Sequence, residues 1–255
     1  ENALDASVSG GNNTAIGKDA LTVNTSGANN TSTGSLSLAA NTTGSQNTAI
    51  GRKALNANST ASNNTAVGKN ALLLNETGHS NTAVGSESLD ANTVASNNTA
   101  VGFVALSANT TGSQNTGIGR AALGTNSTAD NNTAVGYNSL LVNTTGTQNV
   151  AVGANALDAN TTGSNNNAVG QHALSTCISG SNNNAFGRAC LELNTADNNT
   201  AVGHHALLVN TTGTQNTAVG SLALDAVTTS NNHVAVGFNS LSANTSGEKN
   251  TGVGS

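Results

Sequence analysis

The side chains best suited to metal binding are five histidines and two cysteines. His172, His204 and His205 are the one grouping for which a shared metal ion is conceivable. No Cys or carboxylate joins them at the spacing of metal ligands. Histidines at variable, solvated positions are therefore the preferred interpretation, and no metal or cofactor site is predicted.

The two cysteines, Cys177 and Cys190, occupy different phases of the repeat described below. Cys190 replaces a small residue and is expected to be a buried thiol, whereas Cys177 replaces a turn Asn. Their different phases favour two free thiols over a disulfide.

Acidic residues are the remaining candidates for chemistry. They fall mostly at variable, exposed positions, as Glu76, Glu87, Asp90 and Asp158 do. No Ser-His-Asp order, paired carboxylates or phosphate loop stands out. Solubility is the preferred role of these charges, and we expect no enzymatic activity and no catalytic residue.

Asn-x-Thr/Ser triplets match N-glycosylation sequons, for instance at Asn41, Asn143 and Asn210. They also arise automatically from the repeat. The structural interpretation holds for a bacterial or phage protein, and the sites would matter in a eukaryotic secretory protein.

Composition excludes several classes of protein. Only 2% of the 255 residues are aromatic and 7% are charged, with a net charge of −5. Without a basic patch or an aromatic platform, nucleic-acid binding has no electrostatic basis. No apolar run approaches membrane-spanning length, so this segment is not expected to insert into a membrane. Such a chain cannot fill a wide core.

A repeat of 17 residues organises the whole chain. Gly recurs from Gly17 to Gly254 at this period, with one step of 16 residues between Gly187 and Gly203. The consensus is N-T-A-V-G-x-x-A-L-x-x-N-T-T-G-x-x. Short strand-like segments bounded by Gly and Asn predict an all-β fold, a parallel β-solenoid (β-roll) of about fifteen 17-residue coils.

Stacking of the coils gives each repeat position a role. Val or Ile before the Gly, and Leu four residues after it, are expected to form two apolar ladders that supply most of the core. Small residues belong where backbones approach closely, inside the coil or against another chain. We expect Asn side chains to hydrogen-bond along the stack, and the Gly of N-T-T-G to be left-handed. The predicted structural ladder includes Val67, Gly68, Leu72, Val135, Gly136, Leu140, Val152, Gly153, Leu157, Asn132 and Asn149.

Residues 1–255 are expected to form a single repeat domain. Neither end carries a polar capping repeat, which solenoids need to remain unpolymerised. We therefore expect a piece of a longer fibre or a unit that stacks end to end.

The repeat resembles that of a known family. N-T-A-V-G, and especially Asn149 to Gly153 (N-V-A-V-G), is similar to the S-V-A-I-G repeat of YadA-like heads in trimeric autotransporter adhesins. Similar N-T-A-x-G-x-x-A-L repeats occur in tail-fibre-like proteins of phages and bacteria. The resemblance implies a homotrimer of narrow β-rolls, exposed on a cell or virion surface and binding host, matrix or glycan components. The 17-residue coils and the Asn/Thr richness depart from the adhesin pattern.

Three functions fit parts of the sequence pattern. The first is a structural or adhesive segment of an extracellular fibre that associates with itself, as a trimer or an end-to-end polymer. The second is an ice-binding β-solenoid, because Thr stands three before the Gly in 11 of 15 coils. Thr and Val of T-A-V share a strand face, so a Val core would bury the Thr ladder. A polysaccharide-cleaving β-helix ranks last, because the coil is narrow and its charges are sparse.

Overall fold

The computed structural model describes residues 3–6 and 9–255. The chain divides into two compact units, Glu1–Asp130 and Asn131–Ser255. In each unit one three-residue strand recurs per coil, and neighbouring strands pair in parallel, as β3 with β4 and β12 with β13 do. The predicted all-β parallel β-solenoid is confirmed. The described residues contain no helix, and so none that is long and apolar enough to cross a bilayer.

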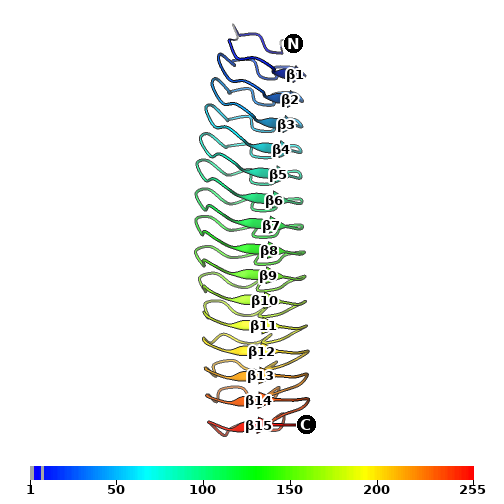
Figure 1. The fold of residues 1–255 in the computed structure, drawn as a ribbon, viewed down its shortest axis with the longest axis vertical. Coiled ribbons are helices and arrows are strands. Elements are labelled where there is room, and N and C mark those ends of the chain that lie inside the picture. The colour runs from blue at the N-terminus through cyan, green and yellow to red at the C-terminus, as the bar shows by residue number, and fades with distance from the viewer. Residues whose placement is uncertain (1–2, 7–8) are drawn as a thin grey trace. The chain divides into compact units, whose positions relative to one another are not determined.

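The strands of each unit stack in chain order (Figure 1). The strands of the first unit are β1 (Thr14–Ile16), β2 (Thr31–Thr33), β3 (Thr48–Ile50), β4 (Thr65–Val67), β5 (Thr82–Val84), β6 (Thr99–Val101) and β7 (Thr116–Ile118). Those of the second unit are β8 (Thr133–Val135), β9 (Val150–Val152), β10 (Asn167–Val169), β11 (Asn184–Phe186), β12 (Thr200–Val202), β13 (Thr217–Val219), β14 (Val234–Val236) and β15 (Thr251–Val253). The register pairs equivalent positions, for example Ala66 with Ala83.

The interior of a coil is narrow and mostly polar or small. In the coil that contains β4, the fully buried side chains are Asn64, Ala66, Ala71, Leu72 and Asn75. Leu is thus the one large apolar side chain that each typical coil buries, an interaction of roughly 1.5–3 kcal/mol. The small residues of the repeat lie inside the coil.

The prediction that Val and Ile form a core ladder is wrong. The middle residue of each strand points inward, so the first and third residues point outward together. Ile50 and Val84 are 41% and 36% exposed, and Val67, Val135 and Val152 are half-buried. Volume decides the outcome, because the inner strand position lies against the Leu ladder and admits only a small side chain.

One ladder of buried amides runs along the strand entrance, at the Asn four residues before each Gly. The Asn47 backbone N–H donates to Asn30 Oδ1 (3.0 Å) of the preceding coil, and Asn47 Nδ2 donates to the carbonyl of Ala61, 14 residues later in the chain (2.8 Å). Asn149 repeats both contacts, with Asn132 Oδ1 and the Gly163 carbonyl. Each amide therefore joins coils that the chain connects only through a loop.

A second ladder lies at the Asn seven residues after each Gly. Asn58 Nδ2 donates to Asn41 Oδ1 (2.9 Å) and to the carbonyl of Ala61 in its own coil (3.0 Å). The predicted hydrogen bonding of Asn along the stack is confirmed at both positions. Burying these amides is tolerable only because they are paired in this way.

The second ladder is interrupted twice in the second unit. Cys177 stands where the ladder needs an Asn, and the Oδ1 atom of Asn160 in the preceding coil has no hydrogen-bond partner. Val227 interrupts it likewise and leaves Asn210 Oδ1 without a partner. At each interruption, one buried Asn Oδ1 acceptor lacks the amide donor that the next Asn of the ladder would supply.

The backbone of each coil turns through left-handed residues. Gly68 has φ +138°, as expected for the recurrent Gly, but Leu72 also has φ +50°. A left-handed Leu is strained, so burial of its side chain and the bonds between coils must offset that cost. The predicted left-handed Gly of N-T-T-G is wrong: Gly44 is not left-handed, and Gln46 two residues later takes that conformation.

The remaining residues of the predicted ladder occupy three environments. Leu72, Leu140 and Leu157 are fully buried, and Asn132 and Asn149 lie in the first amide ladder. The glycines Gly68, Gly136 and Gly153 are left-handed, with φ between +133° and +138°.

We predict that Cys177→Asn stabilises the protein. The new amide would donate to Asn160 Oδ1, which should raise the free energy of unfolding by about 1–2 kcal/mol. Urea denaturation followed by circular dichroism measures this change. Val227→Asn should give a similar gain, and Asn58→Ala, inside an unbroken stretch, should lower stability. An unchanged or lower midpoint for both repairs would contradict the proposed role of the ladder.

Candidate functional site

One regular surface of each unit is the strand face, defined as the outward side chains of the first and third residues of each strand within a unit. Thr65 and Val67 of β4 represent the common pair. Neighbouring strands lie about 4.8 Å apart, and the two columns of side chains about 7 Å apart. The face thus spans about 30 Å of stacking over β1–β7, and none of its side chains carries a charge.

Threonine hydroxyls on the strand face have no hydrogen-bond partner within the described chain. The Thr residues of the N-T-T corner differ, because Thr42 Oγ1 donates to the Ser59 carbonyl (3.1 Å) and Thr110 Oγ1 to the Ser127 carbonyl (3.0 Å). The strand hydroxyls therefore remain available to water or to another molecule.

Three residues of the second unit interrupt the Thr-Val pattern strongly. Asn167 and Asn184 replace Thr in β10 and β11, and Asn167 Nδ2 donates to Asn184 Oδ1 (2.8 Å). Phe186 replaces Val in β11 and is 43% exposed. These residues make one polar and aromatic step on an otherwise uniform face.

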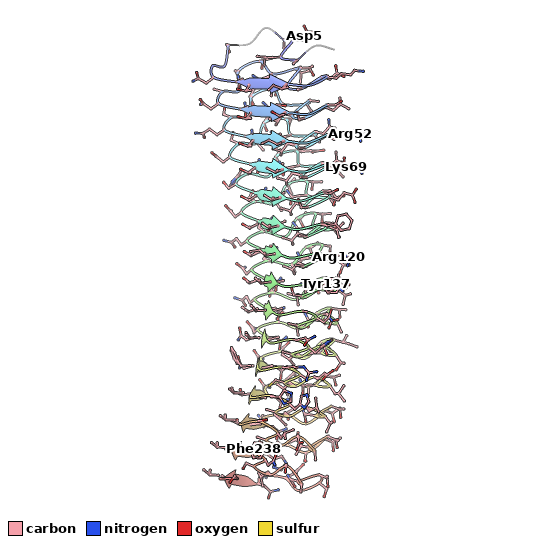
Figure 2. The ribbon with its side chains drawn as sticks, turned by 90° about the vertical axis from the view of Figure 1, so that its right-hand side faces the viewer. Asp5, Arg52, Lys69, Arg120, Tyr137 and Phe238 are labelled. Atoms are coloured by element: carbon pink, nitrogen blue, oxygen red, sulfur yellow. The ribbon has the colours of Figure 1, made fainter. Side chains whose placement is uncertain are left out.

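Charged and aromatic side chains gather at a different edge of the coil, at the one or two positions after the recurrent Gly. Arg52, Lys69 and Arg120 of the first unit lie there and project outward (Figure 2). Lys69 forms an exposed ion pair with Glu87 (3.4 Å). Exposed pairs of this kind contribute little to stability, so the edge tolerates variation.

His204 and His205 of the second unit form a stacked pair, and they are not grouped with His172 as metal ligands. The rings of His204 and His205 lie 3.7 Å apart, and both Nε2 atoms are 3.3 Å from Arg188 Nη1, which can only donate. Burial, followed by the charges of His204 and Arg188, lowers the pKa of His205. Within the described ranges, no three His, Cys, Asp or Glu side chains are grouped to hold a metal ion.

His233 takes the place of an Asn in the first amide ladder. It is buried, and its Nδ1 accepts a hydrogen bond from the Asn250 backbone N–H (3.2 Å). His79 lies on the exposed corner. Neither contributes to a site.

Both cysteines are buried free thiols. Cys177 Sγ donates to the Gly180 carbonyl and Cys190 Sγ to the Ala201 carbonyl. Burial raises the pKa of Cys177 to about 11 and that of Cys190 to about 12. Since the thiolate is the reactive form, neither is a nucleophile at neutral pH.

Among the acidic residues, Asp90 and Asp158 occupy equivalent positions five residues after the Gly. Each has a solvent-excluded Oδ1 atom without a hydrogen-bond partner. Burial is the main cause that raises the pKa of both carboxyls. The charge of Glu87 contributes to the raised pKa of Asp90, and Glu76 lies on an exposed turn.

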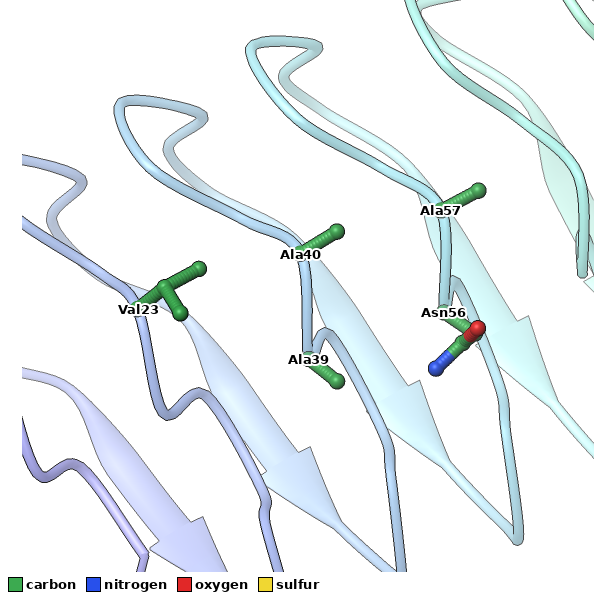
Figure 3. Close-up of a pocket in the computed structure, with 5 residues that line it drawn as sticks. All are labelled: Val23, Ala39, Ala40, Asn56 and Ala57. Atoms are coloured by element: carbon green, nitrogen blue, oxygen red, sulfur yellow. The ribbon is translucent and has the colours of Figure 1, made fainter.

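A surface depression is lined by Val23, Ala39, Ala40, Asn56 and Ala57 (Figure 3). It arises where alanines follow the larger Val23 in successive coils. Its lining carries no titratable group, so it offers no catalytic chemistry.

The three sequon asparagines named from the sequence belong to the second amide ladder. Asn41, Asn143 and Asn210 are fully buried, so the folded chain presents none of them to a glycosyltransferase.

The strand face was not predicted from the sequence as an exposed surface, because Val was assigned to the core. The small residue always found between Thr and Val was the available signal.

A comparison with protein-family models and with curated protein sequences found no match for this chain.

We predict that Asp90→Asn stabilises the protein at pH 7. A carboxyl whose pKa is raised on folding favours the folded state at low pH, and this contribution is lost as the pH rises through the folded-state value. The variant should therefore unfold at a higher urea concentration than the parent at pH 7, and the difference should shrink at pH 3. Glu76→Gln, at an exposed turn, is the control and should change neither midpoint. A gain for Asp90→Asn of equal size at both pH values would exclude ionisation as its cause.

Proposed function

We propose that this chain is a structural, adhesive segment of an extracellular fibre, in which copies associate side by side through the strand face. The observation that carries the proposal is the column of Val and Ile side chains on the outside of nearly every coil. Ile50, Val84 and Ile118 of the first unit are 36–41% exposed. A continuous uncharged face of this kind is typical of a surface that is covered by a partner.

The division of apolar side chains between the interior and the surface of each coil supports the same proposal. Each typical coil buries one Leu, while a second branched apolar side chain remains on its surface. Covering that second side chain against another copy would add hydrophobic stabilisation that one chain cannot obtain alone. Homodimeric and other obligate interfaces are apolar at their centre, with charges at the rim. Here the charges likewise lie away from the strand face.

A homotrimer is the assembly we favour. Cyclic symmetry about an axis parallel to the stacking direction brings the same face of each copy to the centre. The resemblance to the head repeats of trimeric adhesins favours three copies over an end-to-end polymer. The edge that carries the charged and aromatic side chains, after the recurrent Gly, would then remain on the outside of the trimer. There the proposed partner is a host surface, a matrix component or a glycan, at a cell or virion surface.

We predict that one charge on the strand face disrupts the assembly. The parent chain should have a mass of three chains by light scattering on a size-exclusion column. Val84→Lys should reduce the mass to one chain while the circular dichroism spectrum is retained, because burying an unpaired ammonium is costly. Ser86→Lys is the matched control, because equivalent positions carry Lys18, Arg52 and Lys69. A parent chain that is a monomer contradicts this proposal.

Ice binding is the second candidate, and one observation favours it. Thr and Val both point outward, so the Thr ladder is exposed instead of buried behind a Val core. Unpaired hydroxyls and methyl groups at regular spacing on a flat face can hold an ordered layer of water. This function requires the face to be free, whereas the fibre requires it to be covered.

If the face binds ice, the chain should be monomeric and should show thermal hysteresis. Thr82→Tyr, which breaks the flatness of the face, should then abolish most of the hysteresis. Thr77→Tyr, at an exposed turn, should leave it unchanged. A parent chain without thermal hysteresis contradicts the ice-binding function.

A further inference from the structure

The uniformity of the strand face creates a problem of register for the proposed assembly. Most coils present Thr together with Val or Ile, so two copies that slip by one or two coils exchange nearly identical contacts. Only the contacts at the ends are lost in such a slip. Register is weakly specified whenever a surface is this uniform.

We propose that Asn167, Asn184 and Phe186 fix the register in which copies of this chain associate. This inference rests on the proposed self-association through the strand face. The three residues lie in the adjacent strands β10 and β11 and break the pattern in both polarity and size. Val150 and Val234 also replace Thr, but Val has nearly the shape of Thr and discriminates weakly.

The two Asn side chains retain bonding capacity for another copy. Asn167 Nδ2 donates to Asn184 Oδ1 within the chain (2.8 Å). The Asn167 Oδ1 and Asn184 Nδ2 atoms have no partner within the described chain, and an amide nitrogen carries two donors. In parallel copies without a slip, Asn residues of different copies meet at the same level and can bond to one another.

A slip of one coil leaves a single match, Asn167 against Asn184, and a slip of two coils removes all of these matches. Each Asn then faces Thr or Val instead of an amide: against Val it has no hydrogen-bond partner, and against Thr it meets one hydroxyl in place of an acceptor oxygen and two N–H donors. Phe186, whose ring is large and 43% exposed, then meets Val on the neighbouring copy rather than another Phe186. A single polar residue in an apolar interface is known to select register in this manner.

Cysteine cross-linking of the full chain tests the proposal. Val202→Cys and Val236→Cys place thiols on the strand face two coils apart, beyond the reach of a disulfide between copies in register. The two variants are unfolded together, refolded as a mixture and mildly oxidised. Links between like positions report the register, and mixed links report a slip of two coils. The native cysteines are buried and do not compete.

We expect mixed links to be about tenfold rarer than like links, a ratio that corresponds to roughly 1.4 kcal/mol. In the background Asn167→Thr, Asn184→Thr and Phe186→Val, which restores the common pattern, the assembly should persist and both links should form in comparable yield. The background Val150→Thr and Val234→Thr is the matched control and should retain the parent's discrimination.

The outcomes separate the two proposals. If the triple variant associates and still excludes mixed links, the register function is wrong and self-association stands. If the parent has the mass of one chain by light scattering, self-association fails, and the register function fails with it.

Discussion

The narrowness of the coil is the constraint on which the rest of this structure depends. An interior that admits one Leu and a few methyl groups cannot hold the chain together by hydrophobic burial alone. Buried amides take over much of that role. Through Asn47 and Asn58, each coil is hydrogen-bonded to its neighbours by side chains as well as by backbone. The Asn ladders therefore stand where a larger protein would place its second layer of apolar side chains.

This constraint explains what could be predicted from the sequence. The period, the parallel strands and the Asn hydrogen bonds all follow from the exact repetition of Gly and Asn. Which side chains of each strand face the interior did not follow from the sequence, because three residues are too few to show an alternation of inward and outward side chains. Val67 was assigned to the core by hydrophobicity, although the interior selects by volume and admits Ala66. The left-handed Leu72 was also unpredictable, because its conformation is imposed by the closure of the coil.

Because Val lies outside the core, the strand face becomes a candidate binding surface. A Val core would bury the strand Thr and leave a polar exterior with little to recognise. With Ala inside, most coils instead present a hydroxyl beside a branched apolar group on one face. The same face suits a second copy of the chain or an ordered layer of water, and it cannot serve both at once. The state of assembly is therefore the physical variable that separates the two functions.

Repetition has opposite effects within a chain and between chains. Within the chain, covalent connection fixes which coils are neighbours. Equivalent residues therefore stack in a single register, and ladder Asn side chains of successive coils hydrogen-bond to one another. Between chains nothing fixes the offset, and identical coils make many offsets nearly equal in energy. Cys177 and Val227 show that a departure from the pattern costs the interior a hydrogen bond. The departures at Asn167, Asn184 and Phe186 lie on the outer face, where they cost the coil nothing and where only an external partner can distinguish them.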